Sequence, residues 1–300
     1  MTTGVLLMAH GTPASAAEIE PFYTRIRRGR PPEPAQLAEL EGRYRAIGGL
    51  SPLRERTRAQ VDAVRGALER RSPGRYVVEF GAKHTDPLIE DAAAKLASDG
   101  LDRVIGLVLT PHASSMGSQE YLDRAAAALP STPFVPIGSW YGEPGFVTLL
   151  AARVAAAVDA QPGRSTVVFT AHSLPERVRA GGDTYPEQVA ESARLVADAA
   201  GLSRWGVAWQ SAGRTPEPWL GPDVRDEVRR LAAEGGTDGV IVCPIGFVSD
   251  HLEVLYDLDV ELAAVAADCG LGYARTTSLN DDPAFVSVLA DVITAADGAP

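Results

Sequence analysis

The sequence alternates short apolar runs, each bounded by Gly, Pro or Ser, with longer segments that have the period of a helix. This alternation is typical of a parallel β-sheet with helices on its faces, because parallel neighbours must be joined by a long crossover. The segments that we predict to be strands are residues 5–9, 76–81, 104–110, 134–137, 166–171, 206–209, 240–244 and 272–275. The segments that we predict to be helices are residues 89–97, 121–129, 147–158, 187–200, 224–233, 252–267 and 284–295. The predicted fold class is therefore α/β.

Two of the predicted strands end in similar motifs. The first strand ends in Ala-His10-Gly-Thr-Pro, and a strand 162 residues further on ends in Ala-His172-Ser-Leu-Pro. Since 300 residues are enough for two domains, we predict two similar, doubly wound (Rossmann-like) halves, residues 1–145 and 146–300. Ligands of open parallel sheets bind beyond the carboxyl ends of the strands, so both histidines are expected at a cleft between the halves.

The charge of the chain limits its partners. There are 28 Lys and Arg residues against 39 Asp and Glu residues, a net charge of −11, which argues against a general nucleic-acid binder. Residues 1–75 nevertheless hold 13 Arg and 8 acidic residues, a local charge of +5, which leaves −16 for the remainder. An anionic ligand is therefore expected to bind to the N-terminal quarter of the chain.

Signatures of membrane anchoring and of common cofactors are missing from the sequence. No apolar run reaches the roughly 18 residues that span a bilayer, so we expect a soluble, cytoplasmic protein. Neither a Walker loop nor a Gly-x-Gly-x-x-Gly motif follows a predicted strand, so no nucleotide is expected. Cys243 and Cys269 match no zinc or redox spacing, and two thiolates are too few for a [2Fe-2S] cluster with four cysteine ligands.

Three acidic residues follow one another at helical spacing near the C-terminus. Glu253, Asp257 and Glu261 lie at positions i, i+4 and i+8, where like charges destabilise a helix by roughly 0.2–0.5 kcal/mol per pair. One interpretation makes Asp250 a helix N-cap with Glu253 three residues later, and leaves the other two carboxylates in solvent. The interpretation that we favour places the carboxylates in a hydrated cleft, where they bind divalent cations or accept protons.

Arginines gather in two segments of the N-terminal quarter. Four of the six residues 25–30 are Arg, and a diproline follows, so this segment is predicted to be a basic helix end or a loop. The second segment, Arg43-Tyr44-Arg-Ala-Ile-Gly-Gly-Leu-Ser51, places a double glycine beside a hydroxyl group. Arginine is suited to planar, bidentate recognition of carboxylates and phosphates.

Seven segments resemble the motifs of a known family. They are Leu-Leu-Met-Ala-His10-Gly-Thr-Pro, Ile-Arg27-Arg-Gly-Arg-Pro, Arg43-Tyr-Arg-Ala-Ile-Gly-Gly-Leu-Ser51-Pro-Leu, Ala-His172-Ser-Leu-Pro-Glu, Gly182-Asp-Thr-Tyr-Pro-Glu-Gln, Trp209-Gln-Ser-Ala-Gly-Arg-Thr-Pro-Glu-Pro-Trp-Leu-Gly-Pro-Asp and Gly246-Phe-Val-Ser-Asp-His-Leu-Glu253-Val-Leu-Tyr-Asp. Together they resemble the ferrochelatases, most closely the bacterial branch that inserts iron into coproporphyrin III. The resemblance covers nearly the whole chain.

The resemblance implies a fold, a reaction and a set of site residues. The implied fold is two doubly wound halves around a porphyrin cleft, and the implied reaction inserts Fe²⁺, as a substrate, into coproporphyrin III. His172 and Glu253 would bind the metal and abstract protons, and Asp257 and Glu261 would continue the metal path on a π-type helix turn. The residues implied to bind the macrocycle and its propionates are Arg27, Arg43, Tyr44, Ser51 and Tyr121.

One residue departs from the family pattern. Bacterial relatives often have Tyr where this chain has His10, on the porphyrin face opposite His172. Imidazole is a stronger ligand for ferrous iron than a neutral phenol, so His10 is a candidate substrate-binding residue that coordinates the product. The alternative is that it only forms hydrogen bonds in the cleft.

Substrate and partners remain less constrained than the reaction. The segment 14–34 is mostly polar and rich in Arg, which favours the tetracarboxylate coproporphyrin III over protoporphyrin IX and indicates no stable membrane anchor. Contact with neighbouring enzymes of haem biosynthesis is expected to be transient. The remaining alternatives are a chelatase for another tetrapyrrole and a non-catalytic porphyrin carrier; intact His172 and Glu253 argue against the carrier.

Overall fold

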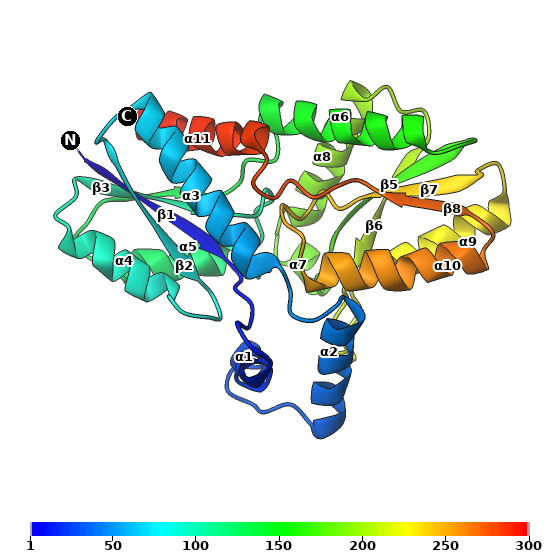
Figure 1. Ribbon diagram of the computed structural model, residues 1–300, viewed down its shortest axis with the longest axis horizontal. Coiled ribbons are helices and arrows are strands. Elements are labelled where there is room, and N and C mark those ends of the chain that lie inside the picture. The colour runs from blue at the N-terminus through cyan, green and yellow to red at the C-terminus, as the bar shows by residue number, and fades with distance from the viewer. Residues whose placement is uncertain (1, 299–300) are drawn as a thin grey trace.

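The computed structural model describes residues 2–298, which form two parallel four-stranded sheets side by side (Figure 1). The first sheet has the order β2-β1-β3-β4, with β1 Thr3–Ala9, β2 Tyr76–Ala82, β3 Arg103–Val108 and β4 Phe134–Ile137. The second has the order β6-β5-β7-β8, with β5 Ser165–His172, β6 Trp205–Gln210, β7 Gly239–Cys243 and β8 Gly272–Arg275. All eight predicted strands are confirmed, with ends that differ by at most two residues.

The two sheets are built in the same way. In each half the first strand lies inside the sheet, between the second and the third strand, and every pairing is parallel. Interior strands of such sheets are covered on both faces and so are apolar throughout. Accordingly, residues 3–8 in β1 and 166–171 in β5 are buried. The predicted pair of doubly wound halves is confirmed.

Helices cover the faces of both sheets. Their bounds are α1 Ile19–Ile26, α2 Pro34–Ala46, α3 Leu53–Arg71, α4 Ile89–Ser98, α5 Ser118–Ala127, α6 Pro144–Ala160, α7 Arg177–Ala180, α8 Tyr185–Ala199, α9 Val224–Glu234, α10 Ala263–Asp268 and α11 Pro283–Gly298. A short 3₁₀ turn, η1 (Ala16–Glu18), precedes α1, and a π-helix, η2 (Val254–Leu262), precedes α10. Six of the seven predicted helices are confirmed as α-helices, and the seventh, residues 252–267, consists mainly of the π-helix η2 followed by α10. The helices between residues 16 and 71 and the short α7 are not predicted from the sequence.

The two arginine segments end short helices that project below the sheets. Helix α1 ends at Ile26, and Arg28 and Gly29 follow with φ of 55° and 84°, so the segment 25–30 is a helix end, as predicted. Helix α2 lies beside α1 in Figure 1 and reaches across to η2 of the second half. Together, α1 and α2 therefore approach both halves of the molecule.

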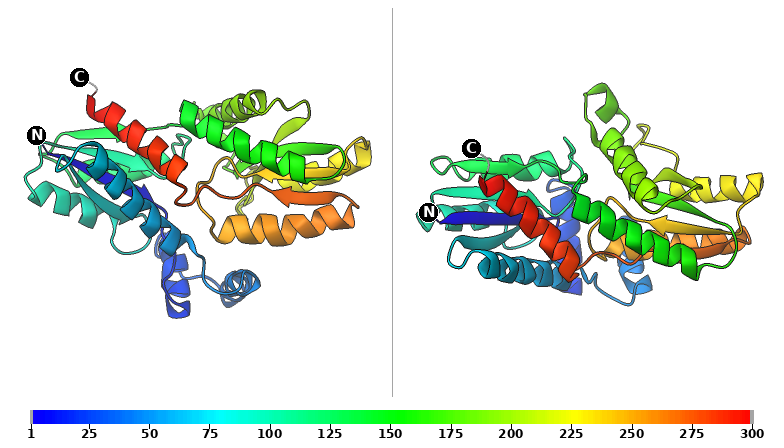
Figure 2. Two further views of the ribbon diagram at one scale, coloured as in Figure 1. Left: turned by 45° about the horizontal axis from the view of Figure 1, so that its top comes forward. Right: turned by 90° about the horizontal axis from the view of Figure 1, so that it is seen from above.

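The chain passes between the halves more than once. Helix α6 packs against α8 and β7 of the second half, but the C-terminal α11 returns to α3 and β3 of the first (Figure 2). One hydrophobic cluster includes Leu7 of β1, Phe169 of β5 and Phe285 of α11. We propose the boundary at residues 145/146 for the two sheets, with α11 as an arm of the second half packed on the first.

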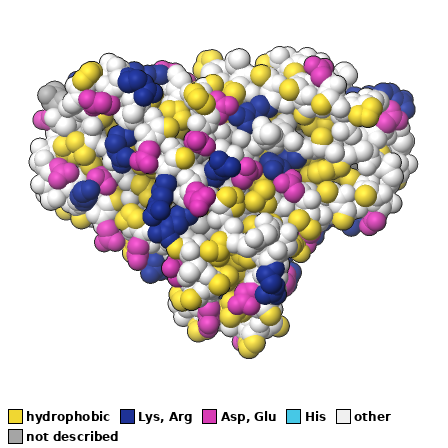
Figure 3. Space-filling view, viewed as in Figure 1, with side chains coloured by type: hydrophobic (Ala, Val, Ile, Leu, Met, Phe, Trp, Pro, Cys, Tyr) yellow, Lys and Arg dark blue, Asp and Glu magenta, His cyan; other side chains and the backbone are white. Residues whose placement is uncertain are grey.

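Charged side chains of both signs are mixed on the surface. On the face in Figure 3, dark blue Lys and Arg side chains lie among magenta Asp and Glu side chains. Several arginines of residues 1–75 form ion pairs that hold elements together, such as Arg71 with Asp291 of α11. None of the helices within residues 2–298 has both the length and the apolar character of a transmembrane segment.

A buried carboxylate attaches α11 to the first sheet. Asp297 is only 4% exposed, and its oxygens accept hydrogen bonds from Thr3 (3.0 Å), Arg75 (2.7 Å) and Tyr76 (3.0 Å), with Arg103 2.8 Å away. Burial alone would raise the pKa of Asp297, but these donors lower it overall. The ionised carboxylate therefore stabilises the fold.

We predict that Asp297→Asn destabilises the protein by about 2 kcal/mol at neutral pH, because charged hydrogen bonds are lost in a buried position. Stability from a carboxylate with a lowered pKa is present above its unfolded pKa and is lost as the pH falls through its folded pKa. The difference between the variant and the parent should therefore shrink in acid. Denaturant unfolding at several pH values measures it.

The control for this prediction is Asp291→Asn, also on α11. Asp291 pairs with Arg71 at 2.6 Å, but its side chain is 63% exposed, so the loss should stay below about 1 kcal/mol. Equal losses for the two variants would contradict a special role for the buried carboxylate.

Candidate active site

A cavity of about 1010 Å³ lies between the two halves. It adjoins the carboxyl ends of β1, β2 and β3 on one side and of β5 on the other, where ligands of parallel sheets bind. Of the site residues predicted from the sequence, those that line it are His10, Arg27, Arg43, Tyr44, Ser51, Tyr121, His172 and Glu253. Asp257 and Glu261 lie further along η2 and do not line it.

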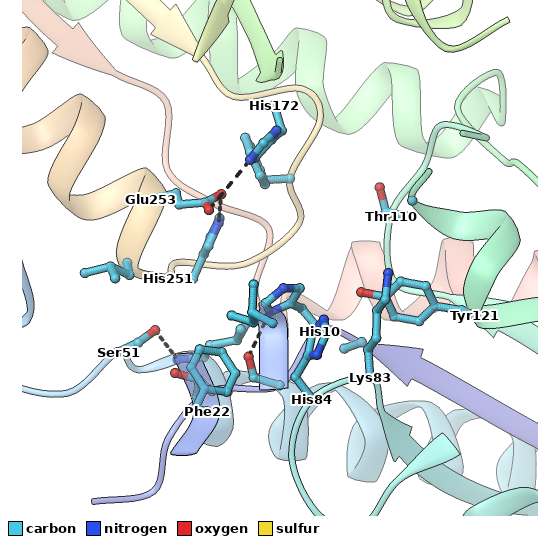
Figure 4. Close-up of a pocket in the computed structure, with 18 of the residues that line it drawn as sticks. His10, Phe22, Ser51, Lys83, His84, Thr110, Tyr121, His172, His251 and Glu253 are labelled. Carbon is cyan, nitrogen blue, oxygen red and sulfur yellow. Dashed lines mark hydrogen bonds and ion pairs between the residues drawn. The ribbon is translucent and has the colours of Figure 1, made fainter. Parts of the chain in front are cut away.

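His172 stands at the end of β5, with one ring nitrogen fixed by the backbone. Its Nδ1 contacts the carbonyl oxygen of Ser173, and since a carbonyl only accepts, Nδ1 carries the proton. The other nitrogen, Nε2, lies 3.8 Å from Oε1 of Glu253 (Figure 4). The local fold therefore orients Nε2 of His172 toward the carboxylate.

Two further imidazoles are held in the same way. Nδ1 of His10 lies 3.2 Å from the carbonyl oxygen of Gly11, and Nδ1 of His251 lies 2.9 Å from that of Ser249. Nε2 of His251 lies 3.7 Å from Oε2 of Glu253. Backbone carbonyls thus engage Nδ1 of each imidazole and leave Nε2 for the carboxylate or a ligand.

The carboxylate of Glu253 is ionised because of these neighbours. Burial would raise its pKa, but the charge interaction with His172, the hydrogen bond and charge of His251, and the charge of His10 lower it to about 2. Burial also favours neutral imidazole, yet Glu253 outweighs it at His251, whose pKa is raised. At His10 burial dominates and lowers the pKa. The carboxylate of Glu253 therefore favours the protonated form of His251, whereas the surroundings of His10 favour its neutral form.

The π-helix η2 begins immediately after Glu253. Its hydrogen bonds span five residues, as in the bond from the amide of Ala263 to the carbonyl of Leu258. The π-type turn implied by the resemblance is therefore present, in place of the regular α-helix that the spacing suggested. Such segments are rare and often occur at functional sites.

Asp257 and Glu261 follow Glu253 on η2, outside the lining of the cavity. Asp257 is 8% exposed, accepts a hydrogen bond from Ser211 and lies 3.5 Å from Arg43. Burial, opposed by the Ser211 bond and assisted by the charge of Glu253, raises its pKa to about 6. The side chain of Glu261 is 33% exposed and faces Arg225 at 3.8 Å. Asp257 is thus enclosed, whereas the side chain of Glu261 is partly exposed.

The helix-cap interpretation of Asp250 is wrong. Its carboxylate accepts hydrogen bonds from Ser278 (2.6 Å) and Asn280 (2.9 Å), on the segment before α11, and does not cap the following helix. Asp257 is buried, whereas that interpretation left it in solvent. A distant segment competes for the Asp250 carboxylate, and a capping pattern cannot reveal this competition.

The predicted metal residues do not form a closed coordination sphere. Among residues 2–298, no three His, Cys, Asp or Glu side chains converge on a common cation position. His172 and Glu253 offer one nitrogen and one carboxylate at the cavity, while Asp257 and Glu261 are placed along η2. Such an arrangement suits a cation that passes through more than one that is retained.

The opposite side of the cavity carries arginines and hydroxyl groups. The guanidinium of Arg27 lies 5.6 Å from the centre of the Tyr23 ring and donates a hydrogen bond to the carbonyl oxygen of Arg30 at 3.3 Å. Arg43 is placed between Glu39 (3.3 Å) and Asp257 (3.5 Å). The remaining arginines of residues 1–75 that line the cavity are Arg25 and Arg28. Of the thirteen arginines in the positively charged N-terminal quarter, four therefore line the cavity.

The three predicted hydroxyl groups lie in the wall with little exposure. Burial raises the pKa of both Tyr44 and Tyr121, so both phenols are neutral. Ser51 accepts a hydrogen bond from the amide of Leu53, at the start of α3. These groups can donate hydrogen bonds to an anionic ligand.

The structure adds residues that the sequence did not single out. Lys83 and His84 follow β2 directly and line the cavity, with the rings of His84 and His10 4.7 Å apart. A His just after a strand was the signal used for His10 and His172, so it could have identified His84. His251 lay within a quoted motif, and His112 follows β3 and is buried in the cavity wall.

The sequence matches one protein family over nearly its whole length. The family described as Ferrochelatase matches residues 2–297. Over 300 residues the chain is 44% identical to a Geobacillus kaustophilus protein named coproporphyrin III ferrochelatase, covering 97% of this chain and 95% of the relative. Over 298 residues it is 43% identical to the Bacillus subtilis protein of the same name, covering 97% and 96%.

A solved structure shares the fold. SirB from Bacillus subtilis with Fe³⁺ superimposes with a TM-score of 0.62 at 13% sequence identity, covering 99% of this chain and 96% of that one. At this identity the likeness concerns the two-half α/β fold alone.

We predict that Glu253→Gln changes the pKa of His251 from above 6.5 to below it, because burial then outweighs the remaining interactions. Chemical shifts of the imidazole C–H groups, followed by NMR against pH, measure this change. His112 is an internal control, since burial alone sets its pKa at about 3. An unchanged pKa of His251 in the variant would show that the Glu253 carboxylate is not what raises this pKa.

Proposed function

The chain belongs to the ferrochelatase family, and we propose that it inserts Fe²⁺ into coproporphyrin III, to give coproheme for haem biosynthesis, with His172 and Glu253 at the reacting centre. The observation that carries this proposal is the pairing of an arginine-lined wall with a wall of oriented imidazoles and one ionised carboxylate. The relatives at 43–44% identity are named for this reaction.

Metal insertion requires the removal of two protons. A free porphyrin gives up two pyrrole N–H protons as one Fe²⁺ enters, so a base must stand beside the ring nitrogens. With a pKa of about 2, the carboxylate of Glu253 is a poor proton acceptor. We therefore assign proton acceptance to Nε2 of His172, which accepts the two protons one after the other and releases the first to solvent before it takes the second, and to Glu253 the stabilisation of the imidazolium that forms each time.

The carboxylates of η2 supply an exit for the protons. Asp257, with a pKa of about 6, exchanges protons readily near neutral pH. Glu261 lies beyond it with a partly exposed side chain. The series Glu253, Asp257 and Glu261 would carry hydrated iron inward, and within it Asp257 and Glu261 would pass protons outward.

The metal needs weak ligands. Fe²⁺ must lose water at the site and then transfer to the porphyrin, so a complete protein coordination sphere would retain it. His172 and Glu253 provide an incomplete one. His10 keeps a neutral Nε2, which supports the hypothesis that it binds the product iron; the alternative, hydrogen bonding only, stays open as well.

The arginines supply binding energy at the periphery of the substrate. Arg27 and Arg43, with Tyr44, Ser51 and Tyr121, are proposed to bind the propionates. Binding energy from groups remote from the reacting atoms can hold the macrocycle out of plane and expose its nitrogen lone pairs. This is the role proposed for the positively charged wall.

The environment of the reaction follows from the same features. We propose that the protein works in the cytoplasm without a stable membrane anchor or a nucleic-acid partner, in keeping with its net charge of −11. A [2Fe-2S] cluster is not part of the proposal, because the chain has two cysteines and Cys243 is a buried thiol whose pKa burial raises to about 12. Transient contact with neighbouring enzymes stays a prediction.

We predict that the purified protein metallates coproporphyrin III faster than protoporphyrin IX, because its arginines match four propionates better than two. Anaerobic Fe²⁺ with each porphyrin in parallel, followed by the loss of free-porphyrin fluorescence, measures both rates. Equal rates would remove the preference for coproporphyrin, and turnover with neither would overturn the proposed function.

We predict that His172→Ala lowers the insertion rate at least about a hundredfold, the usual contribution of a general base, while coproporphyrin still binds. Stopped-flow absorbance measures insertion, and fluorescence titration measures binding. The control is Asp259→Asn, on η2 but paired with Arg275 at 2.6 Å and outside the cavity. Near-normal turnover of the His172 variant would remove His172 from the mechanism.

A further inference from the structure

An ion pair crosses the mouth of the cavity between the two halves. Arg214, from the loop after β6, pairs with Glu39 of α2: Nη1 lies 2.5 Å from Oε2, and Nη2 contacts Oε1. Both residues line the cavity, and the Arg214 side chain is 72% exposed. A parallel, two-bond pair of this kind is the geometry in which arginine recognises any carboxylate.

One carboxylate serves two arginines at this point. Glu39 also accepts a hydrogen bond from Arg43 at 3.3 Å, and both arginines lower the pKa of Glu39. A guanidinium has five N–H donors, so the two bonds to Glu39 leave donors of Arg214 for a further acceptor, whereas Arg43 also faces Asp257 at 3.5 Å. The Glu39 carboxylate thus occupies a position at Arg214 that a carboxylate of a ligand can take over.

The loop that carries Arg214 is held in place. A side chain at Gly213 would collide with the indole of Trp219, so that position requires glycine, and Nε1 of Trp219 donates to Oγ1 of Thr215 at 2.9 Å. The amide of Leu220 bonds to the carbonyl of Leu174 at 2.8 Å, beside the strand end that presents His172. Arg214 therefore projects into the mouth of the cavity from an ordered platform.

We infer that Arg214 is a specificity-determining residue that binds a propionate of the tetracarboxylate substrate, with Glu39 as its counter-ion while the cavity is empty. This inference rests on the proposed function. Binding exchanges one carboxylate for another at the guanidinium, so the charge of Arg214 is compensated throughout. Protoporphyrin has two fewer propionates than coproporphyrin, so an additional arginine at the mouth of the cavity strengthens its binding less.

A purely structural role for Arg214 makes a different prediction. If the ion pair only ties the two halves together, removing either partner should have the same effect. If Arg214 binds substrate and Glu39 competes for it, the two substitutions act in opposite directions. The contrast between Arg214→Gln and Glu39→Gln therefore separates the two roles.

The test measures kcat and KM for Fe²⁺ insertion into coproporphyrin III and protoporphyrin IX. We expect Arg214→Gln to raise KM for coproporphyrin about tenfold, the equivalent of about 1.4 kcal/mol, with kcat within about twofold and KM for protoporphyrin little changed. Glu39→Gln should leave KM for coproporphyrin unchanged or lower it. The Arg214 effect should decrease with added salt, because the site is exposed.

A matched control and two outcomes complete the test. Arg194→Gln removes a surface pairing on α8, with Glu191 and Asp198, away from the cavity, where the arginine side chain is 48% exposed against 72% for Arg214, and should not change KM. A rise in KM shared by the Glu39 and Arg214 variants, or one equal for both porphyrins, would overturn the inference. No insertion by the parent protein with either porphyrin would overturn the proposed function instead.

Discussion

The site depends on one ionised carboxylate held among imidazoles. Glu253 would be protonated more easily if burial acted alone, but His172, His251 and His10 keep its pKa at about 2. Backbone carbonyls that engage Nδ1 of each ring direct Nε2 toward the cavity or the carboxylate. The loops that follow β1, β5 and β7 thus provide fixed peptide groups, Gly11, Ser173 and Ser249, and these groups decide which nitrogen of each histidine is available for chemistry.

The two walls of the cavity divide the chemical work. One wall carries the carboxylate and the imidazoles, which suit protons and a divalent cation. The other carries arginines from α1, α2 and the loops between them, which suit carboxylates. Parallel sheets bring both sets together because the carboxyl ends of their strands meet at one edge, and α2 reaches across to η2. The arrangement separates binding of the substrate periphery from reaction at its centre.

The fold could be predicted from the sequence almost completely, and the site in part. A fully apolar run of four to eight residues with turn residues at both ends is typical of an interior parallel strand, so all eight strands were found. The helices between residues 16 and 71 were not assigned, although α1 and α2 carry part of the site. One interpretation of the sequence makes Asp250 a helix cap. In the structure its carboxylate instead accepts hydrogen bonds from Ser278 and Asn280, which belong to a distant segment.

The sequence by itself determined the α/β class, the two halves, the strand-end histidines and the resemblance of the motifs to one family. These properties are local, since they depend on the period of apolar residues and on short motifs. Only the tertiary structure decided which charged groups face one another: Glu253 with His251, Asp257 with Arg43, and Glu39 with Arg214. The last pair is separated by 175 positions. Ionisation and charge pairing depend on distance and burial in space, and the order of residues along the chain does not specify either.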